Sequence, residues 1–430
     1  MTSDKMKLLV TEAVTALAPT FTKIDLHVKG NLERVLQAFR DRRVGAHHFA
    51  SVSGYGHGDM GRDVLDQVFA QVMGAESAAV RVQFVSGTHA IACCLFGILR
   101  PLDELLSVVG APYDTLEEVI GYPLTTDSKG ATYSGSLKDF GITYRQVELT
   151  AEGGVNWEAL ATSVKPQTRM VLIQRSCGYA WRESLSIEDI EKIIKLVKQQ
   201  NPNTVCFVDN CYGEFISDRE PTAVGADIIA GSLIKNPGGT IATAGGYVAG
   251  KTEYVELAAQ RLTAPGIGRE GGATFDLNRL LFQGFFLAPQ MVGEAMKSSH
   301  LAAYVFDKLG YAVKPLPFDP RHDIIQAIQL GSSQKLIEFC RNLQRFSPID
   351  SYVDPVPGGM PGYVSQLIMA GGTFIDGSTL ELSADGPLRE PYTVFLQGGT
   401  HWTHLAIALE NFQIDDFIVS NLEEVLHSPV

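Results

Sequence analysis

The sequence predicts an α/β fold, in which a mainly parallel sheet of seven strands has helices on both faces and a smaller α+β domain follows at the C-terminus. From about residue 78, short β-rich runs alternate with helical stretches. Several of these runs are apolar on consecutive residues, as strands that are covered on both faces require. Beyond about residue 310 the runs become shorter and change in rhythm, which indicates a second domain.

Residues 1–60 precede the first predicted strand, and we expect them to form an N-terminal helical arm and interface loop. LERVLQAFRDRRV has an amphipathic pattern, and the Gly-rich SGYGHGDMGRD follows it. The large domain is expected over residues 61–295. Helical spacing of apolar residues is clear in SIEDIEKIIKLVKQQ. The seven predicted strands lie in AAVRVQFVS, ELLSVVG, ITYRQVEL, RMVLIQRS, NTVCFVDN, ADIIAGSLI and GGYVAG.

The last part of the chain is expected to form the smaller domain. A long helical region from about residue 280 to 310 leads out of the predicted sheet, and Pro289 is expected to kink it. IIQAIQLG, SQKLIEFCRNLQRF, SQLIMAGG and TLELS then follow as short strands and helices. We therefore assign residues 296–430 to a small α+β domain.

Composition excludes several classes of partner. The chain of 430 residues has a formal net charge of −13 and a pI near 5.3. A nucleic-acid or anionic-membrane surface would need a basic stripe, and none is visible. No run approaches the roughly 20 apolar residues that span a bilayer. The N-terminus has the pattern of an amphipathic helix rather than of a signal peptide. We expect a soluble, cytoplasmic protein.

Cysteine and histidine spacing gives no sign of a metal site or of a disulfide framework. The histidines lack an H-E-x-x-H pattern, and the cysteines lack C-x-x-C spacing. Most of the cysteines lie in apolar segments typical of buried, reduced thiols. They are Cys93, Cys94, Cys177, Cys206, Cys211 and Cys340.

The first candidate for chemistry is a turn of small residues, Ser86, Gly87 and Thr88, at the end of a predicted strand. Ligands of open α/β sheets bind at the carboxyl ends of the strands. The turn opens into the predicted helix AIACCLFGIL, whose free N–H groups and dipole favour a phosphate. The alternative is that the serine and glycine merely cap the helix.

Two charged residues follow neighbouring strands. Asp209 ends NTVCFVD, where a buried carboxylate needs a partner, and a protonated pyridine nitrogen would be suitable. Lys235 follows ADIIAGSLI, where desolvation is expected to lower its pKa and make it nucleophilic enough for a Schiff base. Ser232 could bind the same phosphate. Asp209 could instead cap a turn or pair with an arginine, and Lys235 could be solvated. Together these features predict pyridoxal 5′-phosphate (PLP) on Lys235.

In six stretches the chain resembles the fold-type-I PLP enzymes of cysteine and methionine metabolism, in the branch described as methionine γ-lyase-like, or aluminium-resistance, proteins. The resemblance extends over nearly the whole chain. It implies a PLP-dependent transferase (aspartate aminotransferase-like) fold and a homodimer or homotetramer that shares its active sites across an interface. The stretches are YGHGDMGRDVLDQVFAQVMGAE, SGTHAI, VDNCYGEF, GSLIKNPGG, TAPGIGREGG and PYTVFLQGG.

The resemblance also implies roles for individual residues of the cofactor site. Lys235 would be the Schiff-base lysine, and Asp209 would be the partner of the pyridine nitrogen. The backbone of Gly87 and Thr88 would bind the phosphate, assisted by Ser232.

Further roles are implied for residues elsewhere in the chain. Tyr113 would stack on the cofactor ring. Tyr55 and Arg62 would reach the phosphate of a neighbouring subunit. Arg389 would bind the α-carboxylate of an amino-acid substrate through its two-pronged guanidinium, with Arg175 as the other candidate.

The expected reaction is cleavage of a C–S bond in cystathionine, methionine or cysteine by β- or γ-elimination. It would proceed through a Lys235 aldimine, with freed Lys235 as the general base. γ-Replacement, racemisation, transamination and retro-aldol cleavage stay open, because they share the same intermediate. A non-catalytic binding relative is an alternative of another class.

A second alternative is a P-loop NTPase. Residues 245–252, GGYVAGKT, match the phosphate-loop pattern G-x-x-x-x-G-K-[ST]. A phosphate loop follows a strand, whereas Tyr247-Val248-Ala249 has the pattern of a strand itself. We therefore favour the PLP interpretation.

Overall fold

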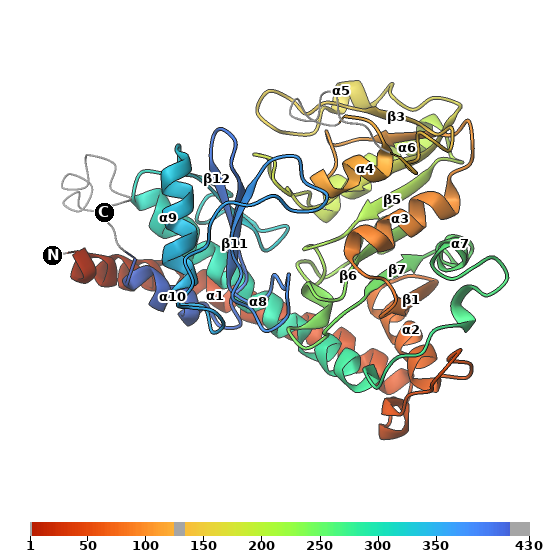
Figure 1. The fold of residues 1–430 in the computed structure, drawn as a ribbon, viewed down its shortest axis with the longest axis horizontal. Helices are drawn as coiled ribbons and strands as arrows, with labels where there is room; N and C mark the ends of the chain where they lie inside the picture. The colour runs from red at the N-terminus through yellow and green to blue at the C-terminus, as the bar shows by residue number, and fades with distance from the viewer. Residues whose placement is uncertain (1, 124–133, 413–430) are drawn as a thin grey trace. The chain divides into compact units, whose positions relative to one another are not determined.

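The computed structural model describes residues 2–123 and 134–412, and the chain divides into two compact units (Figure 1). Residues 29–289 form the first, here called the sheet unit. Residues 1–28 and 290–430 form the second, here called the terminal unit.

Both divisions fall inside long helices. The first lies in α1 (Thr2–Asp41) and the second in α8 (Asn278–Lys308), which contains Pro289. This differs from the boundaries expected at residues 60 and 295. The N-terminal residues do not form an arm of their own but belong partly to each unit. Their first half packs into the core of the terminal unit, as described below.

The sheet unit contains a seven-stranded sheet in the order β1-β7-β6-β5-β4-β2-β3. Strands β3, β2, β4, β5 and β6 pair in parallel, and β7 is antiparallel to both β6 and β1. The predicted mainly parallel sheet is thus confirmed. Its strands are β1 Ser77–Arg81, β2 Glu104–Ser107, β3 Thr143–Gln146, β4 Thr168–Gln174, β5 Val205–Asp209, β6 Ile228–Ser232 and β7 Gly246–Gly250.

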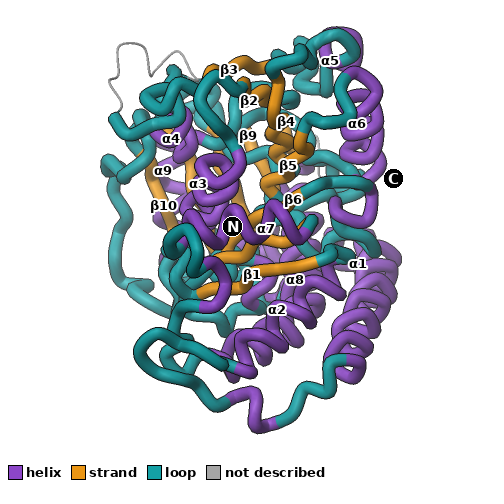
Figure 2. The backbone as a smooth tube through the Cα atoms, turned by 90° about the vertical axis from the view of Figure 1, so that its right-hand side faces the viewer, coloured by secondary structure: helices purple, strands orange, loops and turns teal. Residues whose placement is uncertain are grey.

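Helices cover the sheet on both faces, as the consecutive apolar runs predicted. Figure 2 shows α3 and α6 on opposite sides of the strands. Residues from α3 and α7 share one buried cluster with every second residue of the central strands, such as Phe207, Ala230 and Val248. The helices are α2 Met60–Met73, α3 Gly87–Ile98, α4 Glu117–Ile120, α5 Trp157–Leu160, α6 Ile187–Gln200 and α7 Thr252–Leu262.

Helix α6 illustrates how the local sequence sets an element. The hydroxyl of Ser186 accepts a hydrogen bond from the backbone N–H of Asp189 at 2.9 Å, and the Asp189 side chain bonds back to Ser186. This capping box satisfies N–H groups that the first turn leaves without partners. The apolar stripe predicted from the sequence is buried, and it consists of Ile187, Ile190, Ile193, Ile194 and Val197.

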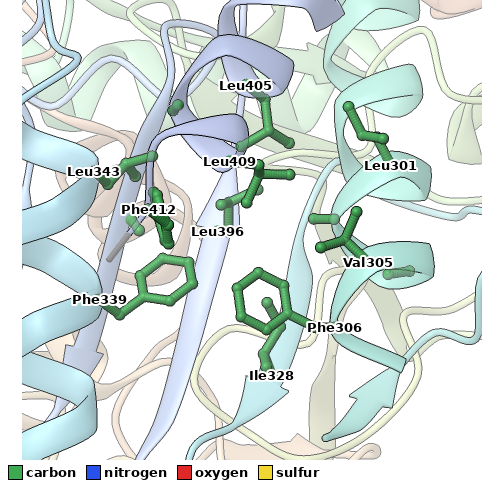
Figure 3. Packing of buried hydrophobic residues seen from close by; sticks show 14 of the residues in the cluster. Leu301, Val305, Phe306, Ile328, Phe339, Leu343, Leu396, Leu405, Leu409 and Phe412 are labelled. Carbon is green, nitrogen blue, oxygen red and sulfur yellow. The ribbon is translucent and has the colours of Figure 1, made fainter. Parts of the chain in front are cut away.

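The terminal unit is the predicted smaller α+β domain. It contains a five-stranded antiparallel sheet in the order β10-β11-β12-β9-β8. Its core joins α1, α8, α9 and α10 to the sheet, and Figure 3 shows Phe306, Ile328, Phe339 and Leu396 meeting there. The remaining elements are β8 Ala312–Lys314, β9 Gln326–Gln329, α9 Ser333–Gln344, β10 Leu367–Ala370, β11 Ser383–Pro387, β12 Thr393–Gln397 and α10 Trp402–Glu410.

The described residues contain neither a candidate membrane-spanning helix nor a cluster of metal ligands. Among residues 2–123 and 134–412, none of the helices is both long and apolar enough to cross a bilayer. The same residues contain no cluster of three or more His, Cys, Asp or Glu side chains that could hold a metal ion. All six cysteines are buried free thiols.

Candidate active site

The turns after β1, β5 and β6 lie at one edge of the large sheet. Strand β6 is parallel to β5, and β1 runs in the same direction because each of β1 and β6 is antiparallel to β7. A Cβ atom added to Gly87 would lie 3.3 Å from both Cys211 Sγ and Ser232 Cβ. The structure therefore brings the small-residue turn, the residues after Asp209 and the end of β6 into contact, as the strand order predicts.

The turn after β1 forms the N-terminus of α3. The Ser86 hydroxyl accepts a hydrogen bond from the backbone N–H of His89 at 3.1 Å, so this side chain is a helix cap. Thr88 Oγ1 lies 2.8 Å from Thr115 Oγ1. The first N–H groups of a helix have no acceptor within the helix, and they carry the positive end of its dipole. The backbone of Gly87 and Thr88 is thus suited to an anion, whereas the Ser86 side chain is already engaged.

Ser232 provides an independent sign of a ligand at this turn. It is the last residue of β6, and only 2% of its surface is exposed. Its hydroxyl oxygen has no hydrogen-bond partner among the residues that the structure describes. A buried hydroxyl left without a partner is costly. A phosphate at the N-terminus of α3 would supply the missing acceptor, so the residues fit the predicted cofactor.

Asp209 ends β5 with a buried carboxyl group. Burial raises the pKa of Asp209, although the Cys211 N–H, which donates to Oδ1 at 3.1 Å, and the nearby Lys235 both act to lower it. A cationic ring nitrogen would stabilise the ionised carboxylate further. The carboxyl group therefore suits the role that the resemblance implies.

Lys235 lies three residues beyond β6 and is partly buried. Its Nζ atom is 4.0 Å from the centroid of the Tyr212 ring. Burial by itself acts to lower the pKa of Lys235, but Tyr212, Cys211 and Asp209 together outweigh burial and raise it. The expectation that desolvation lowers this pKa is therefore wrong for the structure, because the sequence did not show how many acidic groups surround the amine.

Tyr113 lies in the loop after β2, at the same edge of the sheet. Its ring centroid is 5.3 Å from that of Tyr179. A Cβ atom at Gly178 would lie 2.9 Å from Tyr113 Cδ2, so the loop after β4 packs closely against the ring. The stacking of Tyr113 on a cofactor stays a prediction.

Arg175 does not have the surroundings expected of a substrate-binding arginine. Its side chain is fully buried, and it donates to Asn210 Oδ1 at 2.9 Å and to Ser217 Oγ at 3.2 Å, beside the Glu220 carboxylate at 3.5 Å. These contacts engage the guanidinium inside the sheet unit, which argues against the assignment of Arg175. Arg389 follows β11 in the terminal unit, and its role stays a prediction.

Arg62 also has an internal role. Only 1% of its surface is exposed, and its guanidinium donates to the carbonyls of Gly56 at 2.8 Å and Gly272 at 3.1 Å, next to Asp63. It thus fastens two loops of its own chain, which argues against the predicted reach to a neighbouring phosphate. Tyr55, by contrast, is 83% exposed, and its predicted role across an interface stays open.

Sequence reasoning missed Tyr212, which lies against Lys235, and Glu214, which packs against Gly231 of β6. Glu214 is fully buried, and its Oε1 accepts a hydrogen bond from the Tyr247 hydroxyl at 2.7 Å. Burial is the main cause that raises the pKa of Glu214 to about 8. Both residues lie in VDNCYGEF, directly after Asp209. Their orientation depends on the backbone of that turn, which the residue pattern does not reveal.

The P-loop interpretation is wrong. Residues 246–250 form strand β7, so no phosphate-binding loop exists there. Lys251 Nζ forms an ion pair with Asp227 Oδ1 at 2.7 Å. The match to the phosphate-loop pattern is a coincidence of two strand-flanking glycines and a surface lysine.

The strand order, the antiparallel β7 and the smaller sheet define the class of protein: the fold is that of the fold-type-I PLP-dependent enzymes. A family model described as methionine gamma-lyase matches residues 6–417. The chain belongs to the methionine gamma-lyase family, and the family implies PLP as cofactor.

Several proteins are similar to this chain over almost its entire length. A candidate cystathionine beta-lyase involved in aluminum resistance from Listeria monocytogenes has a TM-score of 0.90 and 46% identity, covering 96% of this chain and 100% of that one. A carbon-sulfur lyase involved in aluminum resistance from Clostridium novyi has a TM-score of 0.89 and 46% identity, covering 96% of each chain. The uncharacterized protein YnbB of Bacillus subtilis is 46% identical over 406 residues, which are 94% of this chain and 95% of YnbB.

More distant proteins share the fold alone. The metB protein of Corynebacterium glutamicum has a TM-score of 0.57 at 18% identity and covers 83% of this chain and 85% of its own.

Proposed function

We propose that this protein is a PLP-dependent carbon–sulfur lyase that acts on a sulfur amino acid of the cystathionine, methionine or cysteine type. The unpartnered hydroxyl of Ser232, held against Gly87 at the N-terminus of α3, is the observation that supports the proposal most directly. Lys235 and Asp209 follow neighbouring strands at the same edge of the sheet. The family and the names of the similar lyases support the reaction class.

In this proposal the cofactor, when bound, supplies an electron sink for the substrate. The backbone of Gly87 and Thr88, with the Ser232 hydroxyl, holds the phosphate at the positive end of the α3 dipole. Asp209 pairs with the ring nitrogen, and Lys235 holds the cofactor covalently. Tyr113 covers the ring from the loop after β2.

Lys235 is also the general base. Its free amine would accept the proton from the substrate Cα, so that the C–H bond breaks and an N–H bond forms. The electron pair left at Cα would be accepted by the bound cofactor. Release of the sulfur group from Cβ would then form a carbon–carbon double bond, whereas release from Cγ would also require loss of a Cβ proton, and the departing thiolate would take up a proton. The products after hydrolysis would be a 2-oxo acid and ammonia.

The decisive test is the site of cofactor attachment. The purified protein should show visible absorption that borohydride abolishes, and peptide mapping should find the reduced cofactor on Lys235. Lys235→Ala should lose the band and turnover, because the variant lacks the amine proposed to hold the cofactor. Lys195→Ala, an exposed lysine paired with Glu191, is the control and should behave as wild type. Near-normal elimination by Lys235→Ala would refute the proposal.

Products identify the reaction among the alternatives that share these residues. Release of ammonia together with methanethiol from methionine, homocysteine or cysteine from cystathionine, or hydrogen sulfide from cysteine would support elimination. Formation of a 2-oxo acid with the amino group retained on the cofactor would instead indicate transamination, and incorporation of an added thiol would indicate γ-replacement.

Arg389 is proposed to bind the substrate carboxylate. Arg389→Ala should raise KM at least tenfold while the cofactor spectrum stays unchanged, because a bidentate ion pair contributes roughly 1.5–3 kcal/mol. Arg345→Ala, another arginine of the terminal unit and half-exposed near Asp354, is the matched control. An unchanged KM in Arg389→Ala would direct attention to another cation.

The active unit is proposed to be a homodimer or homotetramer to which Tyr55 contributes across the interface. Its high exposure within one chain is consistent with contact to a second copy. Sedimentation should show a dimer or tetramer. Mixing Tyr55→Ala with Lys235→Ala should restore activity in the mixed assembly, because one site then has both residues intact. Absence of restored activity in a proven mixed dimer would contradict a shared site.

A further inference from the structure

Tyr212 has an unusual backbone conformation directly below Lys235. It lies in the turn after β5 with φ +69°, in the left-handed region that side chains other than glycine rarely adopt. Its ring centroid is 4.0 Å from Lys235 Nζ. Strained residues persist only where the surrounding structure holds them, and they occur most often at functional sites.

The turn is held by contacts on both sides of Tyr212. The N–H of Gly213 donates to the carbonyl of Asn210 at 2.9 Å, and Asn236 Nδ2 donates to the carbonyl of Glu214 at 3.0 Å. A Cβ atom at Gly213 would lie 2.3 Å from Arg175 Cδ, so the chain passes closely over the buried arginine. These contacts hold the backbone that carries the Tyr212 ring beside Lys235.

The face of the Tyr212 ring interacts differently with the charged and with the neutral form of the Lys235 amine. An ammonium ion over the face of a ring is stabilised by about 0.5–2 kcal/mol, whereas a neutral amine gains far less. Asp209 and Cys211 also face Lys235 and favour the ammonium ion, while burial opposes it. Tyr212 also favours the charged form through its hydroxyl, which forms a hydrogen bond with Lys235, so that the hydroxyl and the ring face act in the same direction.

We propose that Tyr212 is a further catalytic group, whose ring strengthens Lys235 as a general base by stabilising the ammonium ion that Lys235 becomes when it takes the substrate proton. The proposal rests on the proposed function, in which Lys235 is that base. The same stabilisation should slow the first capture of the cofactor, because capture needs the neutral amine. Tyr212 should thus speed removal of the substrate proton by Lys235 and slow capture of the cofactor by the same residue.

The first measurement uses protein freed of cofactor. The rate of PLP capture is followed by absorbance as a function of pH, for wild type, Tyr212→Phe and Tyr212→Leu. Tyr212→Leu removes the ring and should move the midpoint of the rate profile down by roughly 0.5–1.5 pH units. Tyr212→Phe keeps the ring face but loses the hydroxyl, so its midpoint should lie between that of wild type and that of Tyr212→Leu. If the midpoint of the pH profile fell as far in Tyr212→Phe as in Tyr212→Leu, the effect would come from the hydroxyl, and the proposed role of the ring would be refuted.

The second measurement follows exchange of the substrate Cα proton for deuterium by NMR in the loaded enzyme. Exchange should slow roughly 3- to 30-fold in Tyr212→Leu, although its cofactor capture at neutral pH is faster. A misplaced turn would slow both steps, and an irrelevant ring would change neither, so either result refutes the proposal.

A second ring-free variant guards against misfolding. Tyr212→Asn suits a positive φ better than leucine does and should reproduce the opposed changes of Tyr212→Leu. Failure of the proposed function has a different signature, since the wild type would then carry no borohydride-reduced cofactor on Lys235.

Discussion

Ser232 is a buried residue whose hydroxyl has no hydrogen-bond partner among the described residues. Ser232 at the end of β6 and Ser86 at the N-cap of α3 lie on either side of Gly87, and only the Ser86 hydroxyl is engaged, so the two serines can be compared directly. One is unsatisfied in the described protein, whereas the other already caps a helix. Their removal should therefore have opposite consequences for stability and for cofactor binding.

Ser232→Ala should leave the cofactor-free protein as stable as wild type or slightly more stable, because an unsatisfied buried hydroxyl is lost. The dissociation constant of PLP should rise about tenfold, since a hydrogen bond to a charged group contributes roughly 1.5 kcal/mol. Ser86→Ala should instead lower the free energy of unfolding by about 1 kcal/mol, as expected for a lost helix cap. Thermal unfolding and fluorescence titration with PLP measure both quantities. Equal loss of stability in the two variants would contradict this view of Ser232.

Helix α3 contributes both to the candidate site and to the packing of the sheet unit, and a different glycine is important for each. Gly87 begins the helix against β6 and the turn after β5, and a Cβ atom there would press on Cys211 and Ser232 at 3.3 Å. Gly97, near its end, lies against α7, where a Cβ atom would come within 2.7 Å of the Leu257 carbonyl oxygen. The first contact concerns the site, and the second concerns packing.

Gly97→Ala should lower the free energy of unfolding by about 1–3 kcal/mol, because backbone of α7 cannot yield easily to an added methyl group. Its affinity for PLP should be unchanged while the protein is folded. Gly87→Ala should destabilise less but weaken PLP binding, since its methyl group enters the space in front of Ser232. Denaturant unfolding and PLP titration of both variants check the contrast. Loss of PLP affinity in Gly97→Ala would show that the packing of α3 on α7 also controls the site.

For the molecule as a whole, buried Glu214 should link stability to pH. In the folded protein the pKa of Glu214 is raised to about 8, whereas its ordinary value is 4.5. Between these values the folded state binds a proton that the unfolded state has lost. The stabilisation is therefore complete below pH about 4.5 and is lost as pH rises to about 8, by at most roughly 1.4 kcal/mol per pH unit.

Glu214→Gln cannot ionise and should lack this contribution to the slope. We expect the wild type to lose stability relative to the variant as pH rises from about 5 to 8. Denaturant unfolding at several pH values gives the difference directly, and other titrating groups cancel in it. A difference that stays constant with pH would mean that Glu214 is ionised in the folded protein.

Much of the fold could be predicted from the sequence, because its signals are local. Consecutive apolar runs marked the strands, and the helical spacing of apolar residues marked α6. Once the strands are parallel, their carboxyl ends share an edge, and this brought Gly87, Asp209 and Ser232 into one predicted site.

The rest depends on residues that are far apart in the chain. Arg62 donates a hydrogen bond to the carbonyl of Gly272, 210 positions away, and no sequence pattern around Arg62 predicts that contact. Arg175 is engaged through Asn210, and the N-terminal helix belongs to two units, for the same reason. By itself the sequence determined the order of elements and the edge at which chemistry would gather, since hydrophobic period and strand direction are properties of short segments. Only the tertiary structure decided which arginines are internal and that Tyr212 faces Lys235, because burial and backbone strain arise where distant segments pack together.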